Sequence, residues 1–190
     1  MFQKRNKELE VLKLYLGDYS RRFYLREIGK LSGMPVKTAY NVLEGLEKSR
    51  VLRSEVSGKN KYFFLNLENI DAKSMLLQAE AARTTDFLEK YPFFRTFLKE
   101  MRTGAAVIVF GSFADFRAGK DSDVDIMVIG KAGLPFHLLP NKPHEIALSE
   151  EGFVKAWDRG ETLIKKIKEN HIMLNNHSFF VNMMWDKYAR

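Results

Sequence analysis

Apolar residues recur at helical spacing through most of the first hundred positions of the chain. The pattern predicts short helices over residues 4–16, 23–31 and 36–49, a helix of about five turns over 71–90, and another short helix over 93–101. Between the third and fourth of these helices, two strand-like runs surround a loop that contains glycine, which predicts a β-hairpin.

The second half of the chain shows shorter, continuous apolar runs that are rich in β-branched residues. Runs over 107–110 and 123–129 predict buried strands, joined by a tight turn and a loop or short helix. Downstream, the pattern predicts strands at 144–148 and 171–174, helices starting at 149 and spanning 163–169, and a closing strand or helix over 179–185. We therefore expect an α+β protein whose C-terminal part is a mixed sheet flanked by helices.

Two polar groups interrupt the buried strands. Gly111 and Ser112 follow the first strand, and a glycine turn of this kind offers backbone N–H groups and a hydroxyl to an anion. Asp123 and Asp125 alternate with Val124, so they point to the same face of the second strand. Such a carboxylate pair is tolerated most easily when a divalent cation lies between its members. Together these groups indicate metal-assisted phosphoryl or nucleotidyl transfer.

The positive charge of the chain is concentrated at its N-terminal end. The formal net charge is +7, and residues 1–66 hold 14 Lys/Arg against 7 Asp/Glu, whereas residues 67–190 hold 17 of each. This asymmetry favours contact between the first third and a nucleic acid or another polyanion. A solvated basic surface without such a partner is the alternative.

Within that basic third, two short helices are joined by a turn that contains Gly33, and a hairpin follows. In spacing and residue type the stretch 23–66 resembles a winged helix-turn-helix DNA-binding domain. The resemblance implies that the helix after the turn enters the major groove of double-stranded DNA and that the hairpin tip lies beside phosphates. The side chains expected to contact DNA are Lys37, Thr38, Tyr40, Asn41, Lys59 and Lys61. A winged helix used only for protein contacts or dimerisation is the alternative.

The stretch from Gly111 to Asp125 resembles the signature of the nucleotidyltransferases of the DNA polymerase β superfamily, and in particular its small, minimal members. Ten residues separate Ser112 from Asp123, as in that group. The chain departs from the family at Asp115 and Phe116, where the family usually has Arg-Gly or a similar small residue.

This second resemblance implies a role for each motif residue. Gly111 and Ser112 would hold the triphosphate of an NTP, with ATP as the first candidate, and Asp123 and Asp125 would bind Mg²⁺. A third carboxylate on a later strand completes the catalytic site of the family. Glu145 is the candidate for that position, and a solvent-facing glutamate on an edge strand is the alternative.

These expectations give a winged-helix domain over 1–66, linker helices over 67–103 and a nucleotidyltransferase-like domain over 104–190. The long linker helix either packs on the C-terminal domain or pairs with its copy in a homodimer. The absence of cysteine and of any apolar run of roughly eighteen residues predicts a cytoplasmic protein without a membrane partner.

Three functions compete. The first is a transcription regulator that senses or uses a nucleotide. The second is an enzyme that transfers NMP from NTP–Mg²⁺ to a protein or nucleic-acid acceptor, as antitoxin-like members of the minimal family do. The third is a nucleotidyltransferase fold without catalysis that serves as a nucleotide-sensing, interaction or dimerisation module.

Overall fold

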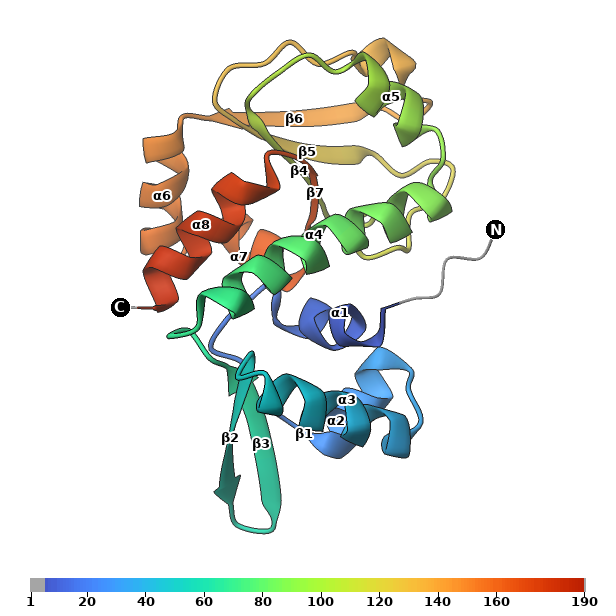
Figure 1. The fold of residues 1–190 in the computed structure, drawn as a ribbon. Helices are drawn as coiled ribbons and strands as arrows, with labels where there is room; N and C mark the ends of the chain where they lie inside the picture. Colours follow the sequence, from blue (N-terminus) through green and yellow to red (C-terminus); the bar gives the residue numbers. More distant parts are fainter. Residues whose placement is uncertain (1–5, 190) are drawn as a thin grey trace. The chain divides into compact units, whose positions relative to one another are not determined.

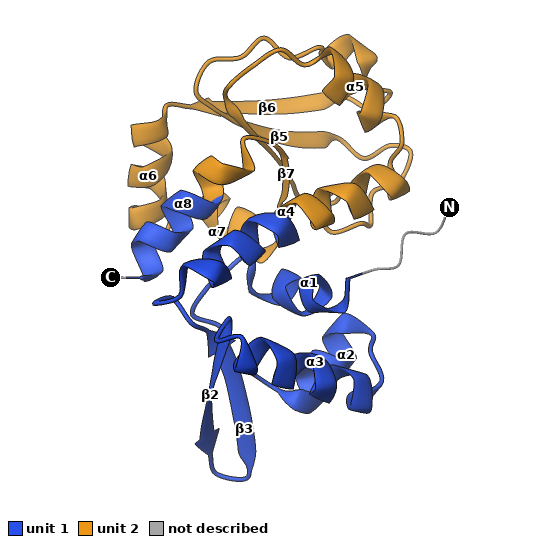
Figure 2. Cartoon of the chain, in the orientation of Figure 1, with its two compact units in different colours: residues 1–80, 181–190 blue, residues 81–180 orange. Residues whose placement is uncertain are grey.

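The computed structural model describes residues 6–189, and the chain forms two compact units. Unit 1 comprises residues 1–80 and 181–190, and unit 2 comprises residues 81–180 (Figure 2). Both boundaries fall inside helices that are labelled in Figure 1, namely α4 (Ile70–Lys90) and α8 (His177–Tyr188), and Figure 2 shows that each of these helices contributes to both units. The division expected from the sequence, at residues 66 and 103, follows the ends of secondary-structure elements, whereas the compact units divide within helices.

The helices of unit 1 begin and end at residues suited to those places. The first predicted helix is α1 (Lys7–Leu12) continued by a 3-10 turn, η1 (Lys13–Tyr15), and its predicted residues 4 and 5 lie outside the described part. Next come α2 (Leu25–Ser32) and α3 (Val36–Lys48). Gly33 ends α2 with φ +67°, a left-handed conformation that glycine adopts without steric cost.

A small antiparallel sheet completes unit 1. Its strands are β1 (Phe23–Tyr24), β2 (Leu52–Ser57) and β3 (Asn60–Leu65), in the order β1-β3-β2. Helix α2 therefore begins two residues later than the sequence pattern predicts, because residues 23 and 24 pair with β3. Ser57 pairs with Asn60, which leaves a two-residue hairpin loop with Lys59 at its tip.

The core of unit 1 joins these helices to the sheet. The Tyr15 hydroxyl donates a hydrogen bond to the Phe63 carbonyl oxygen at 3.0 Å, and the Tyr15 ring meets the edge of Phe23. Burial raises the pKa of Tyr15 far above its ordinary value, so this side chain remains a neutral donor. The fully or nearly fully buried apolar residues around it are Val11, Leu12, Leu16, Ile28, Ala39, Leu43, Leu46 and Leu52.

Unit 2 is built on a four-stranded mixed sheet. The strands are β4 (Ala106–Phe110), β5 (Val124–Ile129), β6 (Pro143–Leu148) and β7 (Ile172–Asn175), in the order β6-β5-β4-β7. Strand β4 pairs antiparallel with β5 and β7, and β5 pairs parallel with β6. Every residue of β4 is buried, as its continuous apolar run predicts.

The remaining helices of unit 2 are α5 (Phe94–Glu100), α6 (Glu150–Arg159) and α7 (Thr162–Glu169), with a 3-10 turn η2 (Phe136–Leu138). The segment over 179–185, predicted as strand or helix, is part of the helix α8. Along residues 6–189, no helix is both long enough and apolar enough to span a membrane.

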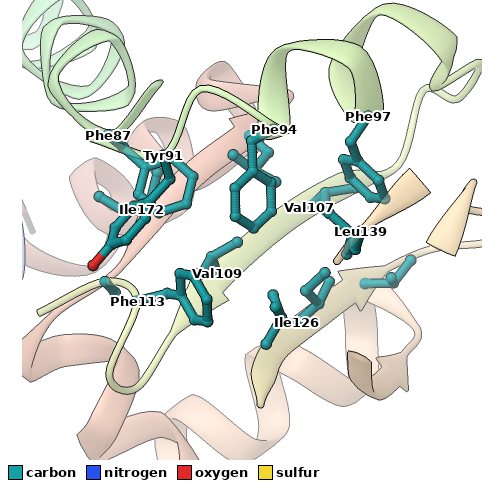
Figure 3. Packing of buried hydrophobic residues seen from close by; sticks show 14 residues of the cluster. Phe87, Tyr91, Phe94, Phe97, Val107, Val109, Phe113, Ile126, Leu139 and Ile172 are labelled. Carbon is teal, nitrogen blue, oxygen red and sulfur yellow. The ribbon is translucent and has the colours of Figure 1, made fainter. Parts of the chain in front are cut away.

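One face of the sheet is covered by a cluster of aromatic rings, shown in Figure 3. The end of α4 and the start of α5 supply Phe87, Phe94 and Phe97, which pack over strand residues such as Val107 and Val109. The ring centroids of Phe87 and Phe94 lie 4.7 Å apart. The alternate apolar residues of the strands, such as Ile108 and Met127, are buried as well. The rings of Phe153 and Trp157 in α6 and of Phe180 in α8 are also buried, and Trp157 contacts both of the other rings.

The aromatic cluster should dominate the stability of unit 2. We predict that Phe94→Ala lowers the free energy of unfolding by about 3–5 kcal/mol, because a fully buried ring leaves a cavity behind. The matched control is Arg95→Ala, an exposed neighbour on the same helix, which should change it by less than about 0.5 kcal/mol. Urea unfolding followed by circular dichroism measures both, and equal losses for the two variants would contradict the prediction.

Candidate functional site

The candidate site lies where β4 ends and β5 begins. Gly111 follows β4 with φ +68°, a conformation that L side chains rarely adopt. A Cβ atom at this position would lie 2.5 Å from Oδ2 of Asp125, far inside van der Waals contact. Glycine is therefore favoured at position 111 by the backbone conformation, and any other residue there would also have to displace the Asp125 carboxylate.

The residues after Gly111 form one tight turn. The Asp115 amide donates to the Gly111 carbonyl oxygen at 3.0 Å, and the Arg117 amide donates to that of Ser112 at 2.9 Å. The chain then continues as a loop to Asp123, so the short helix considered in the sequence analysis is limited to this single turn. Among the described residues, the backbone N–H groups of Ser112, Phe113 and Ala114 have no hydrogen-bond partner.

The aromatic cluster fixes the position of this turn. Phe113 and Ala114 are buried in the cluster, and the Phe113 ring lies 4.9 Å from that of Tyr91. The Tyr91 hydroxyl accepts a hydrogen bond from the Ala118 amide at 3.2 Å. The turn therefore keeps its shape without a ligand, and its free amides are held in place in advance.

The two aspartates stand on either side of a buried residue. Val124 is fully buried in the aromatic cluster, so Asp123 and Asp125 are turned away from that cluster, as the alternation predicts. Asp123 is exposed and Asp125 is half-buried. The loop before them is held by Asn141, whose side-chain amide donates to the carbonyl oxygens of Lys120 and Ser122 at 2.9 and 3.0 Å.

Strand β6 places a histidine beside this pair. In the parallel register of β5 and β6, Asp125 lies opposite His144, and Ile126 lies opposite Glu145. Residues opposite each other share a face, so His144 lies on the face of Asp125 and Glu145 lies on the other. The His144 Nδ1 atom is 3.0 Å from Oδ1 of Asp125. The register thus separates Glu145, the expected third carboxylate, from the aspartate pair.

Asp115 and Phe116, the two residues that depart from the family pattern, both have partners within unit 2. Burial raises the pKa of the Asp115 carboxyl, but hydrogen bonds from Arg117 and Asn170 outweigh it, and the net pKa is lowered. The bond from Asn170 Nδ2 to Asp115 Oδ1 measures 2.7 Å, and Arg83 donates to the same Asn170 side chain. Asp115 is therefore already engaged by protein groups, and its charge is compensated by Arg117.

Phe116 occupies a backbone conformation that suits glycine. Its φ is +59°, and a left-handed non-glycine residue costs about 1–2 kcal/mol. The ring packs on the aromatic cluster, 6.3 Å from the Phe87 ring, and Lys90 donates to the Phe116 carbonyl oxygen. Packing thus offsets the backbone cost, and the half-buried ring extends the aromatic cluster.

The residues expected to contact DNA all lie in unit 1. Lys37, Tyr40 and Asn41 are exposed on α3, and Thr38 is half-buried there. The Tyr40 hydroxyl donates to Glu44 at 2.7 Å, and this bond, with the Glu44 charge, raises the Tyr40 pKa. These side chains form one outward surface of the helix that follows the turn.

The hairpin lysines differ from each other. Lys59 is exposed at the tip, in the two-residue loop. Lys61 lies on β3, and its ammonium donates to the Glu47 carboxylate of α3 at 2.7 Å. This bond, together with one from Ser54, lowers the pKa of Glu47. Lys59 is consequently the hairpin lysine that is available to another molecule.

Sequence reasoning identified the motif but missed three side chains around it. His144, Asn141 and Asn170 contact Asp125, the loop before Asp123, and Asp115 respectively. The position of His144 beside Asp125 could have been predicted only from the register of β6, because a shift of one residue exchanges His144 and Glu145 between the two faces of the sheet. No pattern in the sequence marks Asn141 or Asn170 as a residue of the site.

Comparison with known proteins agrees with this geometry. The family model of the nucleotidyltransferase domain matches residues 93–173, which include the turn, the aspartate pair and β6. No curated protein and no solved structure matches the chain. Residues 93–173 therefore have the character of a nucleotidyltransferase domain, with a fold of the kind used for nucleotidyl transfer.

The contact between Gly111 and Asp125 gives a direct test of the site. We predict that Gly111→Ala lowers the free energy of unfolding of the protein by about 1–3 kcal/mol, because the residue has positive φ and its new Cβ displaces the carboxylate. Gly119→Ala is the control, since a Cβ there meets no atom within 4 Å. Thermal and urea unfolding measure both variants. A Gly111→Ala protein as stable as the control would show that the contact is dispensable.

Proposed function

We propose that residues 93–173 bind a nucleoside triphosphate together with Mg²⁺. The observation that carries this proposal is the contact between Gly111 and the Asp125 carboxylate, which joins the phosphate turn to the carboxylate pair. Free backbone amides next to carboxylates suit a ligand that is itself an anion carrying a cation.

The chemistry of the groups at the site indicates which of them would bind phosphate and which would bind Mg²⁺. The amides of Ser112, Phe113 and Ala114 and the Ser112 hydroxyl would donate to phosphate oxygens. Asp123 and Asp125 would hold Mg²⁺, which proteins commonly bind through one or two carboxylates plus substrate phosphates. When bound, the ion neutralises phosphate charge and orients the phosphates. ATP is the first nucleotide to test.

For unit 1 we propose binding to double-stranded DNA in the manner of a winged helix-turn-helix. The proposal is supported by the order of α2, turn, α3 and hairpin, by the exposed polar surface of α3, and by the basic excess of residues 1–66. The chain would then be a regulator whose DNA binding is linked to nucleotide binding. Transfer of NMP to an acceptor is the second candidate function, favoured by the match to the transferase family.

The nucleotide half is tested by removing charge from the aspartate pair. We predict that the double variant Asp123→Asn, Asp125→Asn binds a non-hydrolysable ATP analogue with Mg²⁺ more than about tenfold more weakly than the wild type. The reason is that the neutral asparagine side chains are poorer Mg²⁺ ligands than the aspartate carboxylates. Asp121→Asn, an exposed aspartate in the preceding loop, is the control and should bind like the wild type. Isothermal titration calorimetry measures all three. An unchanged affinity in the double variant would refute the assigned metal role.

The DNA half is tested by salt dependence. Affinity for DNA upstream of the coding region should fall steeply with salt, and Lys59→Ala should reduce the slope of log K against log salt by about one, because one phosphate contact is lost. Lys61→Ala should change the slope less, since its ammonium is bonded to Glu47. Gel-shift titrations over a salt series measure this, and binding that ignores salt would contradict the assignment.

A further inference from the structure

The residues of β6 beside the aspartate pair limit how many cations the proposed nucleotide site can bind. This inference rests on the proposed nucleotide binding. Enzymes of the two-metal type surround their second ion with additional carboxylate oxygens. On β6, the residue opposite Asp125, whose side chain shares the face of the aspartate pair, is His144. The neighbouring carboxylate, Glu145, lies on the opposite face of the sheet.

The contact of His144 leaves little freedom to Asp125. Its Nδ1 atom lies 3.0 Å from Oδ1 of Asp125, while Oδ2 of the same carboxylate occupies the space that a Cβ atom at position 111 would need. Asp125 is thus held at Oδ1 by His144 and has room at Oδ2 because residue 111 is glycine. A histidine adds a nitrogen, not the oxygen that Mg²⁺ prefers.

No other acidic side chain replaces the missing one. Asp115, the nearest carboxylate in the turn, is bonded to Arg117 and Asn170. Across residues 6–189, no three histidine, cysteine, aspartate or glutamate side chains gather in a way that could hold a metal ion. Asp123 and Asp125 can therefore supply carboxylate ligands to one ion that a nucleotide also holds, whereas the further carboxylate oxygens that a second ion would need are lacking beside them.

We propose that His144 is a positioning residue that holds Asp125 and restricts the site to a single divalent cation. Two-metal transfer is then not available to the wild-type site, and the domain binds its nucleotide rather than consuming it. His144 replaces a group that would add negative charge to the aspartate pair, so the pair remains stable when no cation is bound. The domain thereby suits a nucleotide-responsive module.

The test counts bound Mn²⁺ by electron paramagnetic resonance, with chain and non-hydrolysable ATP analogue at equal concentrations well above the dissociation constant. We expect one Mn²⁺ per wild-type chain and two per His144→Asp chain, since the new carboxylate faces the aspartate pair. Glu145→Gln is the control on the opposite face and should retain one. Without metal, His144→Asp should also melt at a lower temperature than the wild type, and Mn²⁺ should restore it.

Each contrary result has a distinct meaning. Two Mn²⁺ per wild-type chain, or one per His144→Asp chain, would overturn the role of His144 while leaving nucleotide binding intact. Loss of Mn²⁺ from Glu145→Gln would show that Glu145 is a ligand and would overturn the register argument. Failure of the wild type to bind the analogue at all would instead remove the proposed function, and this inference with it.

Discussion

The close approach of the Asp125 carboxylate to Gly111 is the constraint on which the candidate site depends. Phe110 pairs with Asp125 in the antiparallel ladder of β4 and β5, and the chain leaves the ladder at Gly111 with φ +68°, next to this pair. A Cβ atom at position 111 would lie 2.5 Å from Oδ2 of Asp125, so any other residue there would have to displace the carboxylate. The turn that starts at Gly111 and the carboxylate pair that starts at Asp123 are twelve positions apart in the sequence and are brought together by the pairing of β4 with β5.

The sequence predicted the parts of this site that depend on short-range pattern. The continuous apolar runs fixed β4 and β5, and the alternation of Asp123, Val124 and Asp125 correctly separated polar from buried positions. Strand β6 was also expected, but its register was not. Register depends on which residues of two distant segments meet, and His144 and Glu145 are equally compatible with an exposed edge strand.

Other features could not be foreseen because packing decided them. Phenylalanine at position 116 does not itself predict a left-handed backbone, although the glycine that the family usually has there is compatible with one, and packing on Phe87 offsets the cost of this conformation. Lys61 looks in the sequence like a second free lysine of the hairpin, yet it is paired with Glu47 of α3. In both cases the contacting residue is distant in the sequence, so the sequence around Phe116 or Lys61 does not reveal what the side chain contacts.

Within unit 2, helix α4 contacts the turn that starts at Gly111 at several points. Lys90 donates to the Phe116 carbonyl oxygen, the Phe87 ring packs on Phe116, and Arg83 supports Asn170, which in turn holds Asp115. The same helix begins at Ile70, within unit 1. Because a helix is stiff along its hydrogen-bonded axis, Arg83, Phe87 and Lys90 keep a fixed arrangement relative to one another, and a displacement of the turn would be opposed at all three residues together.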